Sequence, residues 1–299
     1  MYIVDFFKNL FKKANIGIII WLVLNIALIM AIFSGGVADW RGALFGFIAY
    51  AISMVIALSP IGEWILRLQT GCKKVTDQAV LDRLQPIFDE VYAKAKAINP
   101  ELPAKVKFFM SEDEAPNAFA TGRKTVCVTR GLLNYSDEHI KGVLAHEFGH
   151  LAHKDTDIIL VVSVGNLIVT AIFVFVRIIY NITAGIAAII SAVSENGWVS
   201  IFAALFVICS KITDFILVLM MRLWTQIGVW LCMASSRKNE FLADAYASDC
   251  GYGYALSEVL ESFGTERSKN GLFASLSSSH PENADRVAKL RGENLIANN

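Results

Sequence analysis

Residues 146–150 read His146-Glu147-Phe148-Gly149-His150, and the rest of the chain can be interpreted outward from this stretch. Two histidines that are four positions apart on a helix project from the same face. Their imidazole rings can bind one Zn²⁺ ion, which takes histidine nitrogens at about 2.0–2.1 Å. Glu147 lies beside them, where its carboxylate could act on water held by the metal. The stretch therefore predicts a metal site that still needs a third protein ligand.

The sequence around the two histidines supports a helix at this place. Ser136, followed by two acidic residues, is typical of a helix N-terminus, and apolar residues at helical spacing extend the predicted helix to Leu151. Two strand-like segments precede it, Val106–Met110 and Thr125–Thr129, and together with residues 117–122 they predict a small sheet of about three strands. The H-E-x-x-H pattern on a helix after such a sheet is typical of zinc metalloproteases.

A further histidine, His153, is not expected to bind the same metal. Seven residues of straight helix separate it from His146, which corresponds to about 10.5 Å along the axis. The longer metzincin pattern is also absent, because it needs glycine and histidine where this chain has His153 and Thr156. We therefore interpret His153 as a structural or solvated residue.

Composition indicates a membrane protein. Of the 299 residues, 55% are hydrophobic and 18% are charged, whereas soluble domains carry about 25% charged residues. The apolar excess lies in four blocks long enough for membrane helices: Asn15–Phe33, Ala43–Leu58, Ile158–Val193 and Val199–Ala234. The 27 Lys and Arg residues balance the 27 Asp and Glu residues, so charge gives no indication of a nucleic-acid partner. The five cysteines show no C-x-x-C spacing and are interpreted as reduced thiols.

Basic residues predict how these blocks are oriented. Three lysines precede the first hairpin and Arg67, Lys73 and Lys74 follow it, so the positive-inside rule puts both ends in the cytoplasm. A cleaved signal peptide is disfavoured, because the first apolar run exceeds the usual h-region of about 7–15 residues.

The second hairpin is expected to cross the membrane first from residue 158 to about residue 179. Residues 184–193 are too few to span alone, so they either lie at the interface or prolong a helix. Arg177 is expected near a helix end, where its side chain can reach the interface. Lys211 and Asp214 either form an ion pair or mark a membrane boundary.

The third metal ligand is sought on a later helix, where Glu240 and Asp244 are four positions apart and share a face. Glu240 as a ligand, with Asp244 orienting a ligand histidine, is one interpretation. A solvated acidic face at a helix end has the same spacing, and both interpretations stay open at this point. If His150 and Glu240 bind one ion, the chain between them must cross the membrane an even number of times, and its two apolar blocks allow two crossings.

The combination of His146–His150 with Asn239–Asp244 resembles the membrane zinc endopeptidases of the HtpX type, whose superfamily includes the CAAX prenyl proteases. Three further segments agree with this resemblance: Asn117–Gly122, Thr129–Leu133, and Ser279–Pro281 with Arg286. The resemblance covers most of the chain, including the four apolar blocks. It implies an integral membrane protein, mainly α with a small β-sheet, with four transmembrane helices and a cytoplasmic gluzincin-like zinc protease domain.

The expected parts are an N-terminal transmembrane hairpin (1–68), a cytoplasmic part with the H-E-x-x-H motif (69–156), a second hairpin (157–222) and cytoplasmic C-terminal helices with the third ligand (223–299). The resemblance implies one Zn²⁺ per chain, bound by His146, His150 and Glu240, with Asp244 supporting Glu240. Glu147 is expected to be the general base.

The resemblance also implies roles around the metal. The edge strand expected to pair with the substrate backbone consists of Asn117, Ala118, Phe119 and Ala120. His280 is expected near the active site, where it could stabilise an oxyanion, and Arg286 is expected to brace it. An ordinary turn at the start of a helix would also explain the His280-Pro281 pair.

From the motif and the resemblance we expect a membrane-bound zinc endopeptidase of the bacterial inner membrane. It would cleave unfolded, misfolded or damaged membrane proteins in quality control and the stress response, with its termini and active site in the cytoplasm. Two alternatives stay open. A CAAX-type protease for prenylated peptides would have more than four spans, and a preference for a prenylated peptide over its unmodified form would favour it. A non-enzymatic metal-stabilised scaffold would have no need for Glu147.

Overall fold

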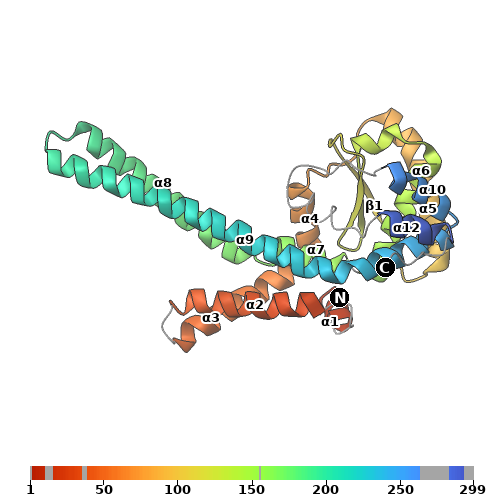
Figure 1. Cartoon of the computed structure of the whole chain (residues 1–299), viewed down its shortest axis with the longest axis horizontal. Coiled ribbons are helices and arrows are strands. Elements are labelled where there is room, and N and C mark those ends of the chain that lie inside the picture. The colour runs from red at the N-terminus through yellow and green to blue at the C-terminus, as the bar shows by residue number, and fades with distance from the viewer. Residues whose placement is uncertain (1, 11–15, 36–38, 155, 263–282, 293–299) are drawn as a thin grey trace, which may run out of the picture.

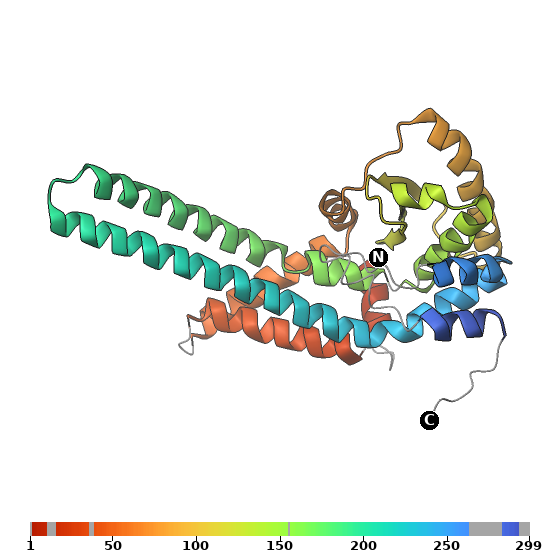
Figure 2. The same ribbon diagram turned by 45° about the horizontal axis from the view of Figure 1, so that its top comes forward.

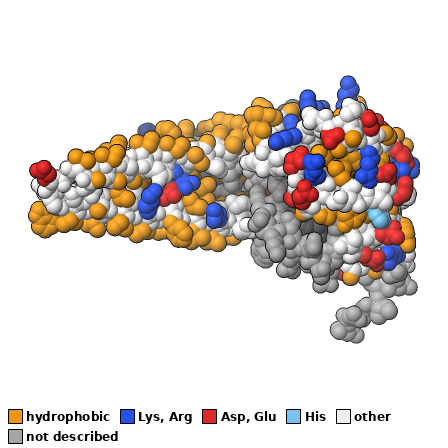
Figure 3. Space-filling model, turned by 90° about the horizontal axis from the view of Figure 1, so that it is seen from above, with side chains coloured by type: hydrophobic (Ala, Val, Ile, Leu, Met, Phe, Trp, Pro, Cys, Tyr) orange, Lys and Arg blue, Asp and Glu red, His pale blue; other side chains and the backbone are white. Residues whose placement is uncertain are grey.

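A computed structural model of the chain describes residues 2–10, 16–35, 39–154, 156–262 and 283–292. Two helical hairpins extend in the same direction from one end of a domain in which helices surround a small sheet (Figures 1 and 2). Hydrophobic side chains are spread along the whole longer hairpin, which carries a small group of charges partway along, and both signs of charge are scattered over the domain (Figure 3). The elements outside the domain are α1 (Tyr2–Leu10), α2 (Ile16–Phe33), α3 (Trp40–Ala57), α7 (Asp157–Val164), α8 (Leu167–Val193) and most of α9 (Gly197–Asp249).

Four helices in the described part of the chain are long and apolar enough to cross a membrane, which confirms the expected number. The candidate spans are Ile16–Phe33, Trp40–Ala57, Thr170–Val193 and Gly197–Gly228. Three polar side chains join the two hairpins. The Asn25 amide N–H donates to the side-chain oxygen of Asn166 at 2.7 Å, and the Asn25 oxygen accepts the Trp224 indole N–H at 2.9 Å. Such bonds are favourable in an apolar bundle because lipid offers no alternative partner.

The second hairpin differs from the prediction in its first leg. The candidate span covers Thr170–Val193 rather than residues 158–179, because α7 is a separate helix that ends at Val164 and packs against α3 and α4. Residues 184–193 prolong α8, which was one of the two expected possibilities. α9 continues for 53 residues, so the predicted boundary at residues 222 and 223 falls inside one helix.

Arg177 lies inside α8 rather than near a helix end, which corrects the sequence-based expectation. It forms an ion pair with Asp214 of α9, with N···O distances of 2.5 and 3.0 Å. Lys211 instead contacts the side-chain oxygen of Asn181 at 3.4 Å. An antiparallel hairpin brings together residues at equal distances from its turn, and this geometry selects Arg177 over the neighbouring Lys211 as the partner of Asp214.

The sheet has three strands, as predicted, in the order β1-β3-β2. β1 (Lys107–Ser111) is parallel to the central strand β3 (Thr125–Thr129), and β2 (Ala118–Thr121) is antiparallel to it. β2 is therefore an edge strand. The turn from β2 to β3 contains Gly122 with φ +60°, a backbone conformation that favours glycine.

Helices cover the sheet and form the core of the domain. They are α4 (Pro60–Gln69), α5 (Gln78–Ile98), a 3₁₀-helix (Arg130–Asn134), α6 (Asp137–His153), α10 (Gly253–Ser262), the end of α9, and α12 (Asn283–Leu290). Phe148 of α6 is fully buried against Phe88 and Tyr92 of α5, with ring centroids 5.3 and 5.7 Å apart. Pro86 lies within α5 without splitting it. This core holds α6 firmly beside the sheet.

Candidate active site

Helix α6 presents the two histidines from a rigid support. Its N-cap is Ser136, whose hydroxyl accepts the backbone N–H of His139, as the sequence predicted. Phe148 is two positions from each histidine, so it lies on the other face of the helix, where it packs into the core. His146 is buried and His150 is partly buried.

Helix α9 approaches α6 closely at this point. Gly149 has no side chain, and a β-carbon there would lie 2.8 Å from the α-carbon of Ala243 on α9. The absence of that carbon allows the two helices to touch backbone to backbone. This contact brings Glu240, one turn before Asp244, over the histidine pair.

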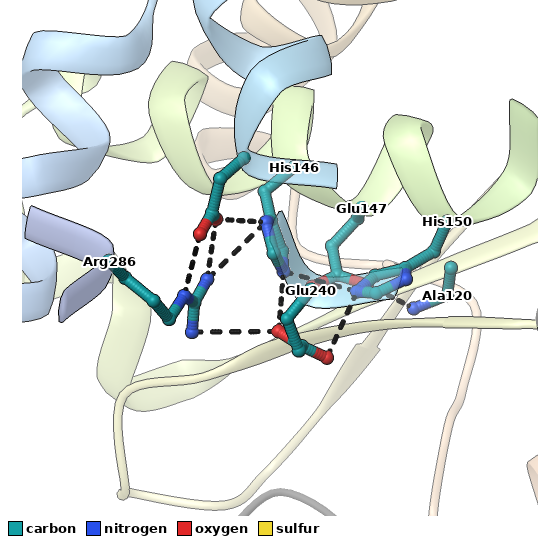
Figure 4. Close-up of polar contacts among 7 residues, drawn as sticks. Ala120, His146, Glu147, His150, Glu240 and Arg286 are labelled. Carbon is teal, nitrogen blue, oxygen red and sulfur yellow. Dashed lines mark hydrogen bonds and ion pairs between the residues drawn. The ribbon is translucent and has the colours of Figure 1, made fainter. Parts of the chain in front are cut away.

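The side chains of three residues from the two helices converge (Figure 4). The Nε2 atoms of His146 and His150 are 3.1 Å apart, and Glu240 oxygens lie 3.4 Å from the first and 3.6 Å from the second. Ligands about 2.05 Å from a tetrahedral ion lie about 3.3 Å from one another. The distances between the ligand atoms and the donor types therefore fit a tetrahedral metal ion such as Zn²⁺.

Asp244 and Arg286 support this group from one side. The Asp244 carboxylate lies 2.9 Å from Nδ1 of His146 and can accept its proton, which leaves Nε2 free to bind a metal. Arg286 donates two hydrogen bonds to Asp244, at 2.7 and 2.6 Å, and lies 3.5 Å from Glu240. Burial alone would raise the pKa of Asp244, but Arg286 and His146 outweigh it and hold this pKa at about 2. Asp244 therefore carries a negative charge at neutral pH.

Glu147 is buried and faces the edge strand. Its carboxylate accepts the backbone N–H of Ala120 in β2 at 2.6 Å. Burial raises the pKa of Glu147 above its usual range, and a bound cation would oppose that shift. Ligand atoms of His146, Glu147 and His150 also lie within 4.8 Å of one another, so proximity alone does not separate Glu147 from the ligands. The bond to Ala120 and the position of Glu240 over both imidazoles favour Glu240 as the ligand.

The structure brings most of the sequence-predicted site residues together. Ala118, Phe119 and Ala120 lie in β2, and Asn117 precedes it, with its N–H donating to the Thr129 hydroxyl at 2.7 Å. His280 and the segment Ser279–Pro281 lie outside the described residues, so the expected contact between His280 and Arg286 stays a prediction.

Two contacts of the site were not predicted. The sequence contains no local signal that Arg286 binds Asp244, because the two residues are 42 positions apart. The Ala120–Glu147 bond is also absent from the sequence interpretation, although an edge strand expected to pair with the substrate is a reason to look for one.

Four apolar helices joined to a domain in which an H-E-x-x-H helix meets a distant glutamate define a membrane protein of the metalloprotease class. Residues 80–294 match peptidase family M48. The match covers well over half of the chain, and the chain therefore belongs to this family.

Three relatives illustrate the similarity. Over 272 residues the chain is 27% identical to protease HtpX of Pseudomonas entomophila, covering 83% of each protein. It is 32% identical over 189 residues to an HtpX homolog of Methanothermobacter thermautotrophicus, covering 60% of this chain and 70% of that one. It is 40% identical over 95 residues to HtpX homolog 1 of Streptomyces coelicolor, covering 30% of this chain but only 29% of that protein. These matches confirm the HtpX-type resemblance inferred from the sequence.

Proposed function

We propose that the chain is a zinc-dependent endopeptidase that cleaves unfolded or damaged membrane proteins on the cytoplasmic side of a bacterial inner membrane. The triangle of residues formed by His146, His150 and Glu240 carries this proposal. The two Nε2 atoms are 3.1 Å apart, Oε2 of Glu240 lies 3.4 Å from His146, and Oε1 of Glu240 lies 3.6 Å from His150. The size of this triangle suits a zinc ion with three protein ligands and one open position. Three protein ligands with the fourth position left for water or substrate are the arrangement of catalytic zinc rather than structural zinc.

The residues around the triangle suit peptide hydrolysis. A bound zinc ion would act as a Lewis acid that polarises the scissile carbonyl and makes water more nucleophilic at neutral pH. The Glu147 carboxylate accepts the proton of the attacking water and delivers it to the leaving amine. Its position within reach of both the histidine pair and the edge strand supports this role.

The edge strand supports an unfolded substrate. In an antiparallel strand, the N–H and C=O groups of alternate residues point to opposite sides, and the N–H of Ala120 points toward Glu147 rather than toward β3. An extended substrate chain could accept this N–H and lengthen the sheet, which would free the Glu147 carboxylate. Backbone pairing of this kind requires an unfolded chain and little specific sequence.

The arrangement of the hairpins supports the proposed side of the membrane. The domain lies at the base of both hairpins (Figure 1), and the first hairpin is followed at that end by Arg67, Lys73 and Lys74. By the positive-inside rule this end faces the cytoplasm. Damaged membrane proteins on that side are then the available unfolded substrates.

The test measures zinc content and cleavage of an unfolded membrane protein by the purified full chain in detergent. The wild type should contain one zinc ion and cleave. Glu240→Ala should lose both properties, whereas Glu147→Gln should keep zinc and lose cleavage. Glu112→Gln, which changes an exposed glutamate of the same domain, is the matched control and should behave as wild type. Full zinc and activity in Glu240→Ala, or cleavage by Glu147→Gln, would overturn the assignment.

A further inference from the structure

Helix α4 has an apolar face that no described part of the chain covers. Ile61, Trp64 and Leu68 follow one another at helical spacing, and they are 57%, 54% and 61% exposed. The opposite face is buried and contains Glu63 and Leu66. An amphipathic helix with a central tryptophan on its apolar side is typical of a membrane interface.

The position of α4 selects a lipid bilayer as the partner of this face. The helix begins at Pro60, three residues after the membrane helix α3 ends at Ala57. Its axis runs across the direction of the two hairpins, so it would lie along a membrane that the hairpins cross (Figure 1). The continuity with α3 means that the bilayer surface is already beside the first turn of α4.

The buried face of α4 holds the turn that follows the edge strand. The Glu63 carboxylate accepts the backbone N–H of Arg123 at 2.7 Å. Gly122, with φ +60°, makes room for this contact, because a β-carbon there would lie 2.1 Å from the Glu63 side chain. Glu63 itself is only 4% exposed, so its carboxylate is sequestered from water.

The same turn is held on its other side by the segment that leaves α6. The Arg123 guanidinium pairs with the buried Asp157 carboxylate at 2.6 Å, and the Thr156 hydroxyl donates to the carbonyl oxygen of Gly122. Both Thr156 and Asp157 follow closely after the H-E-x-x-H helix. The turn therefore lies between α4 on one side and the start of α7 on the other.

We propose that the bilayer, through α4, positions the edge strand: Ile61, Trp64 and Leu68 enter the lipid interface, and Glu63 on the opposite face holds the turn after β2 in register with the active site. Ala120, whose N–H meets Glu147, is only three residues before Arg123. A displacement of the turn is thus transmitted directly to the strand. Glu63 is a positioning residue, since its polar contacts are with Arg123, Thr125 and Arg67 and not with the ligand triangle or Glu147. The inference rests on the proposed peptidase function.

The lipid contact is tested in vesicles of phosphatidylethanolamine and phosphatidylglycerol whose acyl chains are brominated near the headgroup. The fluorescence of Trp64 is obtained as the difference between the wild type and Trp64→Phe. Quenching of this difference by the brominated lipid is the expected result. A Trp64 emission that the lipid does not quench would overturn the membrane contact.

The positioning role is tested by steady-state cleavage of an unfolded protein, with zinc content measured in parallel. Glu63→Ala leaves the Arg123 N–H without its acceptor, and KM should rise about tenfold, as expected for loss of a hydrogen bond to a charged group. Zinc content and kcat should stay near wild type. Glu63→Gln keeps an acceptor oxygen and should restore most of the KM. An unchanged KM in Glu63→Ala, or a loss of zinc, would overturn the role.

A surface variant avoids the risk of misfolding. Leu68→Ser should raise KM in vesicles and leave it unchanged in detergent, and the control Ile98→Ser, at an exposed position of α5, should change neither. Equal effects of Leu68→Ser in the two media would contradict the inference. Wild-type cleavage that depends on zinc and Glu147 would still support the proposed function, so the two failures can be distinguished.

Discussion

Replacing Gly149 with alanine tests the helix contact on which the metal site depends. A β-carbon at this position would lie 2.8 Å from the α-carbon of Ala243, whereas ordinary contacts begin near 3.4 Å. α9 must therefore retreat by about 0.6 Å, the difference between these distances, while metal–ligand distances are held within about 0.2 Å. Glu240 is on α9 and its histidine partners are on α6, so the retreat widens the ligand triangle.

The expected effect has two parts. Overpacking should lower the free energy of unfolding by about 1–3 kcal/mol. Zinc affinity should fall by about 10–100-fold, the range found when the support of a metal ligand is lost. Affinity is measured in detergent by competition with a chelator of known zinc affinity, and unfolding is followed on the same sample.

A matched glycine provides the control. Gly185 lies within α8, and a β-carbon there would meet nothing within 4 Å. Gly185→Ala should leave zinc affinity unchanged and, if anything, stabilise the helix by up to about 1 kcal/mol. Wild-type zinc affinity in Gly149→Ala would refute the argument that this contact places Glu240.

Three further predictions concern charges and the metal. Arg286→Ala removes the guanidinium that neutralises the buried Asp244 carboxylate, so the unfolding free energy should fall by about 3–5 kcal/mol in denaturant titrations. Arg286→Lys should restore little of it, because lysine lacks the two-pronged geometry of arginine, and full recovery with lysine would contradict this. Asp214→Leu leaves Arg177 without its ion-pair partner, so it should lower the thermal unfolding midpoint in detergent more than replacement of both Arg177 and Asp214 by leucine. A lower midpoint in the double variant would exclude a membrane-embedded pair. Removal of metal with a chelator should lower the unfolding midpoint, and added Zn²⁺ should restore it; an unchanged midpoint would argue against a bound metal.

Much of the local structure could be predicted because its causes lie within a few residues. The Ser136 cap and the apolar spacing after it predict α6, and the four apolar blocks predict the membrane helices. Helix ends were less predictable where the sequence stays apolar. α7 and α8 lie in one apolar block of the sequence, and the structure divides this block at Gly165 and Asn166, where α7 packs against α3 and α4.

Contacts between distant segments were predictable only where a resemblance supplied them. Glu240 was expected as a ligand on that basis, while its spacing from Asp244 left a solvated face equally possible. The partners of Arg286, the pairing of Arg177 with Asp214 and the burial of Glu63 had no local signal. Each depends on how two elements pack against one another.

By itself the sequence determined that one helix presents His146 and His150 on one face with Glu147 beside them. A helix has 3.6 residues per turn, so two residues four positions apart are about one turn apart and lie on the same face. It also determined that four segments are apolar enough for a membrane. The tertiary structure alone decided that Glu240 lies beside both histidines, because this requires α9 to approach α6 at Gly149. Contacts across about 90 residues of chain depend on packing rather than on spacing, so they become visible only when both helices are in place.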